Sequence, residues 1–70
     1  MSKLKSTLDV KRGDYLRYKF DVEGQGVLVK KILEATKERV KFEGVWVGYG
    51  DLKQEIEIAA ENIGNWDVSK

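Results

Sequence analysis

The absence of both cysteine and histidine is the feature that most constrains what this 70-residue chain can fold into. Domains of this length bury only about 60% of the surface that the unfolded chain exposes, and many depend on disulfides or a metal. Without thiolate and imidazole groups, neither a disulfide framework nor an ordinary zinc site can form. We therefore expect one domain held by packing alone, with no catalytic residue, no metal and no small-molecule cofactor.

The apolar segments are too short to cross a membrane. Runs such as Val27–Val29 and Val45–Val47 contain three residues, whereas a transmembrane helix needs roughly 20. The polar start of the chain also lacks the apolar stretch of a secretory signal. We expect no membrane association, and the absence of cysteine suits a cytoplasmic location.

The net charge of +1 conceals an asymmetry along the chain. Residues 1–41 contain eleven Lys and Arg against six Asp and Glu, a balance of +5, whereas residues 42–70 contain two against six, a balance of −4. If the halves occupy different sides of the fold, the basic side can attract nucleic acid or an acidic protein. If the halves interleave in space, the charges simply solvate the surface.

Apolar residues alternate with polar ones in residues 14–22, which predicts a half-buried strand with Leu16, Tyr18 and Phe20 on one face. Glycines in the following segment, Glu23–Gly26, predict a hairpin turn. Residues 27–34 fit two patterns. Their valine content favours a strand, but Val29 and Ile32 also begin a helical stripe, which leaves a helix near 28–36 as the alternative.

Residues 39–47 alternate again and predict a third strand, interrupted by Gly44. A glycine at this position often marks a bulge or a bend, which would turn Val45 and Val47 inward and Trp46 outward. Without a bulge, Trp46 belongs to the core.

Residues 52–58 also alternate as a strand, although residues 52–63 fit an α-helix beginning after Asp51 and ending before Gly64. Consistency with the preceding short strands favours a strand, then one helical turn at 60–63 and a last strand at 65–68. The sequence thus predicts five strands in one domain over residues 8–68, preceded by a flexible segment over residues 1–7.

The order of these segments resembles an SH3-like barrel over residues 8–68. The resemblance depends on the Lys11-Arg12-Gly13-Asp14 turn leading into the first strand, as in KOW and Tudor-type barrels, and on the helical turn before the last strand. It implies an all-β, five-stranded SH3-like barrel that binds proteins or nucleic acids. The tyrosine-rich segment and long acidic loop of proline-peptide-binding SH3 domains are absent.

The residue pattern indicates two kinds of binding surface. A basic and aromatic strand face would combine base stacking with attraction to phosphates. The apolar runs on both faces of two strands exceed what a small barrel can bury, and indicate a protein partner or a second copy, with tryptophan and tyrosine as anchors. The candidate partner-binding residues are Tyr15, Arg17, Lys19, Lys30, Lys41, Trp46, Tyr49 and Trp66.

We expect a small non-enzymatic binding module that engages a protein partner or self-associates, with nucleic-acid binding as the alternative. Other motifs favour a structural role. Glu55 and Glu57 lie two residues apart, as a carboxylate pair on one strand face would, but nothing nearby would bury either of them. The glycine pairs at 24–26 and 48–50 lack the Gly-Lys-Ser/Thr continuation of a phosphate loop.

Overall fold

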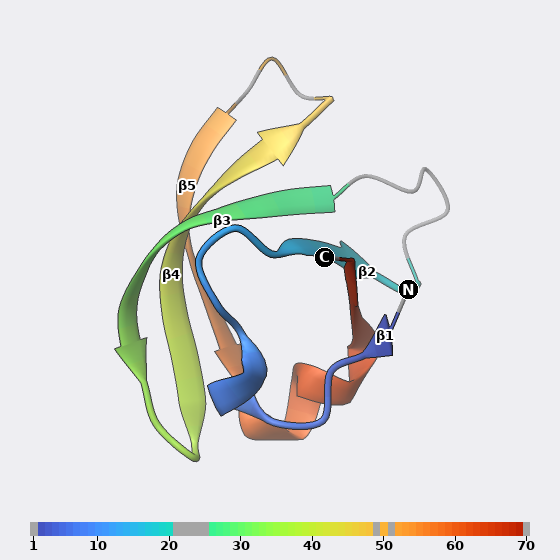
Figure 1. Ribbon diagram of the computed structural model, residues 1–70, viewed down its shortest axis with the longest axis vertical. Helices are drawn as coiled ribbons and strands as arrows, with labels where there is room; N and C mark the ends of the chain where they lie inside the picture. The colour runs from blue at the N-terminus through green and yellow to red at the C-terminus, as the bar shows by residue number, and fades with distance from the viewer. Residues whose placement is uncertain (1, 21–25, 49, 51, 70) are drawn as a thin grey trace.

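One antiparallel sheet, with strand order β1-β6-β2-β3-β4-β5, forms the body of the molecule (Figure 1). The computed structural model describes residues 2–20, 26–48, 50 and 52–69, and within them it contains no α-helix. The strands are β1 (Ser2–Lys3), β2 (Tyr15–Tyr18), β3 (Gly26–Ala35), β4 (Arg39–Val47), β5 (Leu52–Ala59) and β6 (Trp66–Ser69). Two 3-10 helices, η1 (Thr7–Asp9) and η2 (Ala60–Asn65), complete the described elements. The all-β prediction is confirmed.

The five expected strands are present as β2 to β6, and η2 is the expected helical turn before the last strand. The alternative with helices near 28–36 and 52–63 is wrong, because these segments form β3 and β5 followed by η2. Strand β2 ends at Tyr18, earlier than the expected boundary at residue 22. Most of the predicted 23–26 turn lies outside the described residues.

Strand β3 carries two irregularities that explain its ambiguous sequence. Its register against β4 shifts between Val29 and Lys31 and again between Ile32 and Glu34, so Lys30 and Leu33 have no partner on β4. The residues facing the core side are therefore Val29, Ile32 and Ala35, spaced by three instead of two. This spacing resembles a helical stripe. Each extra residue also bends the strand and increases its twist, and β3 is strongly curved in Figure 1.

Gly44 does not form a bulge, because β4 pairs with β5 without a register shift from Arg39 to Trp46. The alternation of β4 continues through the glycine, so Trp46 lies on the core side with Phe42. Close packing explains the glycine at position 44, because a Cβ atom there would collide with Cγ2 of Val27. The sequence allowed either a bulge at Gly44 with Trp46 outward or a regular strand with Trp46 in the core, and the structure has the regular strand.

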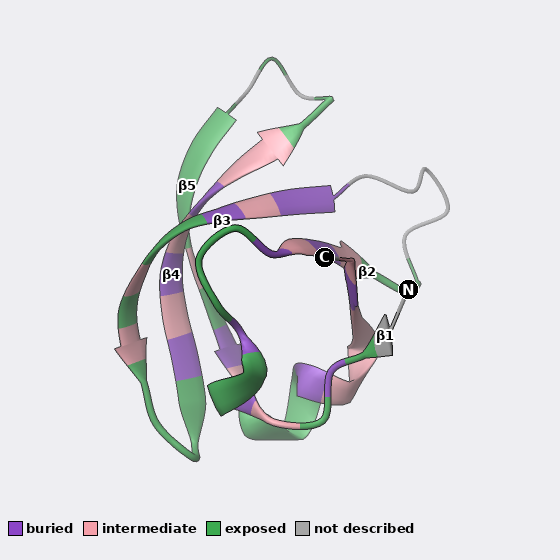
Figure 2. Cartoon of the chain, viewed as in Figure 1, coloured by how far each residue is buried: buried purple, intermediate pink, exposed green. Residues whose placement is uncertain are grey.

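The core lies inside the curve of the sheet and contains side chains from both halves of the chain. Phe42, Leu16, Val27 and Val40 are fully buried, and Figure 2 shows buried segments in purple on β3 and β4. The described core consists of Leu4, Val10, Leu16, Val27, Val29, Val40, Phe42, Ile58, Ile63 and Val68.

The folded unit begins before residue 8, where the sequence places its boundary. Strand β1 pairs with β6, and Leu4 is only 2% exposed within the core. Helix η1 follows with a capping box between Ser6 and Asp9, and the buried hydroxyl of Thr7 donates a hydrogen bond to the carbonyl of Thr36. A single leucine among polar residues has no periodicity, and therefore gives no sign of burial in the sequence.

The Lys11–Asp14 segment forms the predicted turn into β2. The backbone N–H of Asp14 donates to the carbonyl of Lys11, and Gly13 has a φ of 93°, a left-handed value that favours glycine. The carboxylate of Asp14 is buried and accepts a hydrogen bond from the backbone N–H of Lys11. Two backbone hydrogen bonds join Gly13 and Asp14 to Val29, and so fix the turn against β3.

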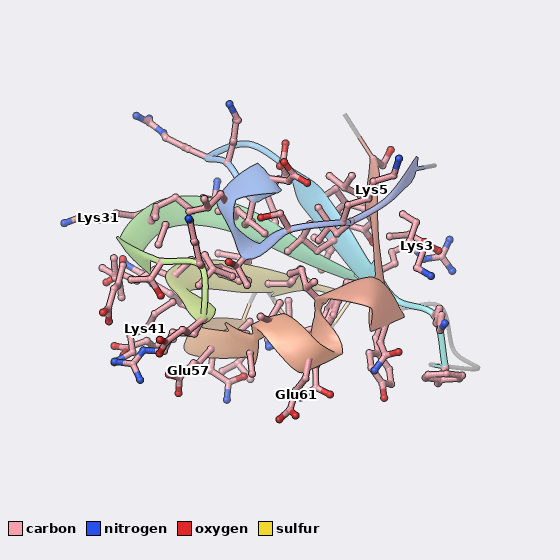
Figure 3. The ribbon with its side chains drawn as sticks, turned by 90° about the horizontal axis from the view of Figure 1, so that it is seen from below. Lys3, Lys5, Lys31, Lys41, Glu57 and Glu61 are labelled. Atoms are coloured by element: carbon pink, nitrogen blue, oxygen red, sulfur yellow. The ribbon has the colours of Figure 1, made fainter. Side chains whose placement is uncertain are left out.

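The two halves of the chain interleave in the sheet, because β6 lies between β1 and β2. Basic residues of β4 also pair with acidic residues of β5: Arg39 with Glu57 at 3.4 Å and Lys41 with Glu55 at 4.0 Å. Figure 3 shows Lys41 and Glu57 on the same side of the sheet. The asymmetry of charge along the sequence is thus largely neutralised where β4 meets β5.

Replacing Gly44 with alanine tests the close packing of β4 against Val27. The added methyl group must displace a fully buried side chain, and we expect the free energy of unfolding to fall by about 1–3 kcal/mol. Gly64→Ala is the matched control, because its nearest neighbour would be the flexible Lys3 side chain at 3.4 Å. Urea unfolding followed by circular dichroism measures both. Equal stability of the two variants would contradict the packing described.

Leu4→Ala tests whether the N-terminal segment belongs to the fold. The structure predicts a loss of about 2–5 kcal/mol in the free energy of unfolding, as for other buried leucines. Leu8→Ala, at a side chain 48% exposed, should change it by less than about 0.5 kcal/mol. The same urea titration distinguishes them, and a Leu4→Ala protein as stable as wild type would place residues 1–7 outside the folded unit.

Candidate functional site

The expected basic and aromatic face of β2 is only partly assembled. Tyr15 and Arg17 lie on the outer face and are half-buried, with the Tyr15 ring over Gly26. In the sheet register, Arg17 lies opposite Asp67. Lys19 follows the strand and is exposed, with its Nζ 4.9 Å from the centre of the Phe20 ring.

Lys30 and Lys41 do not extend this face. Across from Tyr15, the outer face continues with Leu28 and then Val45. Lys30 is exposed at the first irregularity of β3. Lys41 lies opposite Glu34 and Glu57 in the register and forms an ion pair with Glu55. Beside Tyr15, the outer face of β3 and β4 thus carries Leu28 and Val45 in place of these lysines.

The predicted tryptophan anchors come together. Trp46 of β4 and Trp66 of β6 approach to 6.5 Å between ring centres, although two strands separate β4 from β6 in the sheet. Both rings are partly buried and pack against the core. The Trp46 indole N–H donates a 2.8 Å hydrogen bond to Oε1 of Gln54. The third predicted anchor, Tyr49, lies outside the described residues.

The tryptophans continue into a row of aromatic rings that reaches solvent. The ring centre of Tyr18 lies 5.3 Å from that of Trp66, and the ring centre of Phe20 lies 5.5 Å from that of Tyr18 in an edge-to-face arrangement. Tyr18 is 38% exposed, Phe20 62% and Leu52, opposite Trp46 in the register, 55%. We refer to this surface, formed by Tyr18, Phe20, Trp46, Leu52 and Trp66, as the aromatic end.

Sequence reasoning missed Tyr18 and Phe20 as surface residues because their alternation with Leu16 placed them on the core face. They do continue that face, but the strand pairing of β2 ends at Tyr18 and the rings extend past the core. The signal in the sequence was the length of the alternation. The apolar stripe continues past Tyr18, where the four-residue strand β2 ends, and Phe20 beyond it is exposed.

A second surface, which we call the basic corner, gathers Lys11, Arg12, Lys30 and Lys31. The hydrogen bonds from the Lys11–Asp14 turn to Val29 place these two chain segments side by side. All four side chains are exposed and form no ion pair with another described residue. The carboxylates near Lys31 have other partners: Glu34 pairs with Arg39 and Glu43 with Lys53. In Figure 3, Lys31 points away from the sheet.

Glu55 and Glu57 belong to a solvated, paired surface. Their side chains are 59% and 51% exposed and contact Lys41 and Arg39. Across residues 2–20, 26–48, 50 and 52–69, no three acidic side chains converge to hold a metal ion. The same part of the chain contains no helix with the length and apolar content to cross a membrane.

Comparison of the chain with protein-family models, with curated proteins and with solved structures gave no match.

Proposed function

We propose that this protein is a small non-enzymatic binding module that engages a protein partner through the aromatic end. The observation that carries the proposal is the row of four neighbouring rings, Phe20, Tyr18, Trp66 and Trp46, of which Phe20 and Tyr18 are exposed. Exposed aromatic surface is rare unless it is used, and tryptophan and tyrosine are enriched where interfaces gain most of their binding energy.

The construction of the aromatic end suits recognition of an apolar segment. Trp46 and Trp66 pack on the core, so their positions are fixed before a partner arrives. Each outer ring is held by the next, which limits the conformational entropy lost on binding. The Trp46 indole N–H already has its acceptor in Gln54, so Trp46 offers a partner apolar contact. Lys19 beside Phe20 adds one positive charge at the rim.

We also propose that the fold is an SH3-like barrel. The strand order β6-β2-β3-β4-β5, with η2 between the last two strands, supports this. The curvature of β3 and the approach of Trp46 to Trp66 across the interior also support it. Barrels of this kind commonly bind other macromolecules, in agreement with the function proposed here.

Phe20→Ser tests the aromatic end. The tagged protein would be incubated with nuclease-treated lysate of the source organism, and co-purifying proteins compared with those of wild type. Because hot-spot aromatics typically contribute at least about 2 kcal/mol, we expect about tenfold or greater loss of the captured protein. Leu33→Ser is the matched control, an exposed apolar residue on β3. Equal loss in the control, or capture unchanged in Phe20→Ser, would contradict the proposal.

A second candidate function, nucleic-acid binding, is favoured by the basic corner. Four exposed positive charges from two segments lie together without an ion pair to any described residue. Such a cluster attracts a phosphate backbone by counterion release, independently of base sequence. The aromatic rings lie elsewhere, on β2, β4 and β6, so this surface would contact the backbone without stacking bases.

Fluorescence anisotropy with labelled single- and double-stranded oligonucleotides tests this candidate. At low salt we expect binding that weakens steeply as salt is raised. The double variant Lys30→Ala/Lys31→Ala should flatten the slope of log K against log salt by up to about 1.8, since each phosphate contact contributes about 0.9. Lys41→Ala/Lys53→Ala, at lysines already in ion pairs, is the control. No binding at low salt would exclude the candidate.

A further inference from the structure

Strand β5 forms one edge of the sheet and has a free side. It pairs with β4 on one side along its whole length, and no described strand pairs with the other. Residues 52–55 are exposed and Ile56 is only partly buried, and the upper part of β5 is green in Figure 2. An unpaired edge presents backbone N–H and C=O groups that can pair with another strand.

Two devices that usually protect such an edge, proline and a β-bulge, are missing from β5. The chain contains no proline, and the pairing of β5 with β4 is regular, with no bulge to twist the edge away. Charges are present, but they are of both signs: Lys53 is followed on the same face by Glu55 and Glu57. A strand edge with both signs of charge repels a second strand only in some registers and attracts it in others. The edge therefore selects its partner by sequence.

The sequence of β5 is complementary to itself when two copies run antiparallel with Gln54 opposite Gln54. In this register Lys53 lies opposite Glu55 of the second copy, twice by symmetry. On the other face, Leu52 lies opposite Ile56, also twice. Opposite charges and apolar pairs facing each other are the contacts that stabilise neighbouring strands. Within residues 52–56, the two pairs on the outer face of the sheet, Lys53 with Glu55, are attractive. The pairs on the inner face are Leu52 with Ile56, which are apolar, and the two Gln54 amides.

We propose that two copies of this chain form a dimer by antiparallel pairing of β5 in this register, which continues the sheet from one copy into the other. A shift of one pair in one direction sets Lys53 opposite Lys53. A shift in the other direction sets Glu55 opposite Glu55, although Lys53 then lies opposite Glu57. A two-fold symmetric contact of this type closes on itself and leaves no further β5 edge exposed.

The side chains needed for the contact are accessible. The side chains of Lys53 and Glu55 are 67% and 59% exposed. Their ion pairs within the chain, to Glu43 at 3.7 Å and to Lys41 at 4.0 Å, are long and exposed, and surface pairs of this kind contribute little to stability. Leu52, 55% exposed, would lose contact with water against Ile56 of the second copy.

The dimer would also place two binding surfaces at opposite ends. The contact would cover Leu52 of the aromatic end, whereas its four rings lie outside β5, and antiparallel pairing directs the two sets of rings away from each other. If the proposed function holds, the dimer would bind two partner segments at once, and gain avidity for a partner that carries both. This consequence rests on the proposed function, whereas the dimer does not.

Charge reversal at two positions tests the dimer. Lys53→Glu sets the introduced carboxylate opposite Glu55 twice, and Glu55→Lys sets the introduced ammonium group opposite Lys53 twice. Each variant alone should therefore dimerise about tenfold or more weakly than wild type. A mixture of the two should form a heterodimer, because the two carboxylates on the outer face of one chain then lie opposite the two ammonium groups of the other. Sedimentation velocity over a concentration series measures all three samples.

The double variant Lys53→Glu/Glu55→Lys restores both opposite-charge pairs, and should dimerise within about threefold of wild type. Circular dichroism melting of each variant confirms that the chains are folded. A wild-type protein that stays monomeric at all concentrations would overturn the proposal, as would single variants that dimerise normally or a mixture that forms no heterodimer. Capture of a partner by the aromatic end, measured with Phe20→Ser, is independent of these results.

Discussion

The double irregularity of β3 is the constraint on which the rest of the structure depends. Lys30 and Leu33 are extra residues with no partner on β4, and each one bends the strand and increases its twist. This lets one ten-residue strand pair with β2 at its beginning and with β4 along its length. A chain without cysteine or histidine cannot use disulfides or thiolate and imidazole metal ligands, and here the curved sheet lets the strands surround a common core.

The surfaces proposed for binding are consequences of the same curvature. Trp46 and Trp66 meet because the sheet curls β4 toward β6, and their contact supports the exposed rings of Tyr18 and Phe20. The first irregularity of β3 also places Lys30 beside the Lys11–Asp14 turn. The strand order of the described residues ends at β5, whose outer edge carries Lys53 followed by Glu55 and Glu57. Packing thus determines the core, and the exposed residues around it form the surfaces that can contact other molecules.

Much of the architecture was predictable from the sequence, because alternation in residues 39–43 and 52–58 is a local property of strands. The buried Leu4 and Thr7 could not be found, since their burial depends on contacts with distant segments. The helix-like spacing of Val29 and Ile32 arises from irregularities that only the register against β4 reveals. For the site, the tryptophan anchors followed from residue type, whereas the grouping of Lys30 with Lys11 and Arg12 depends on the path of the chain. The separation of Lys41 from Tyr15 likewise depends on sheet order.

The central claim is that the bends of β3 bring Trp46 and Trp66 together over the core. Nuclear Overhauser spectroscopy of the labelled protein tests it most directly, because the chain contains only two tryptophans and their indole signals are easily distinguished. The account predicts cross-peaks between the two indole rings, together with cross-strand contacts between Ile32 and Phe42. Indole rings without mutual cross-peaks, accompanied by sequential amide contacts typical of a helix in residues 28–36, would contradict it.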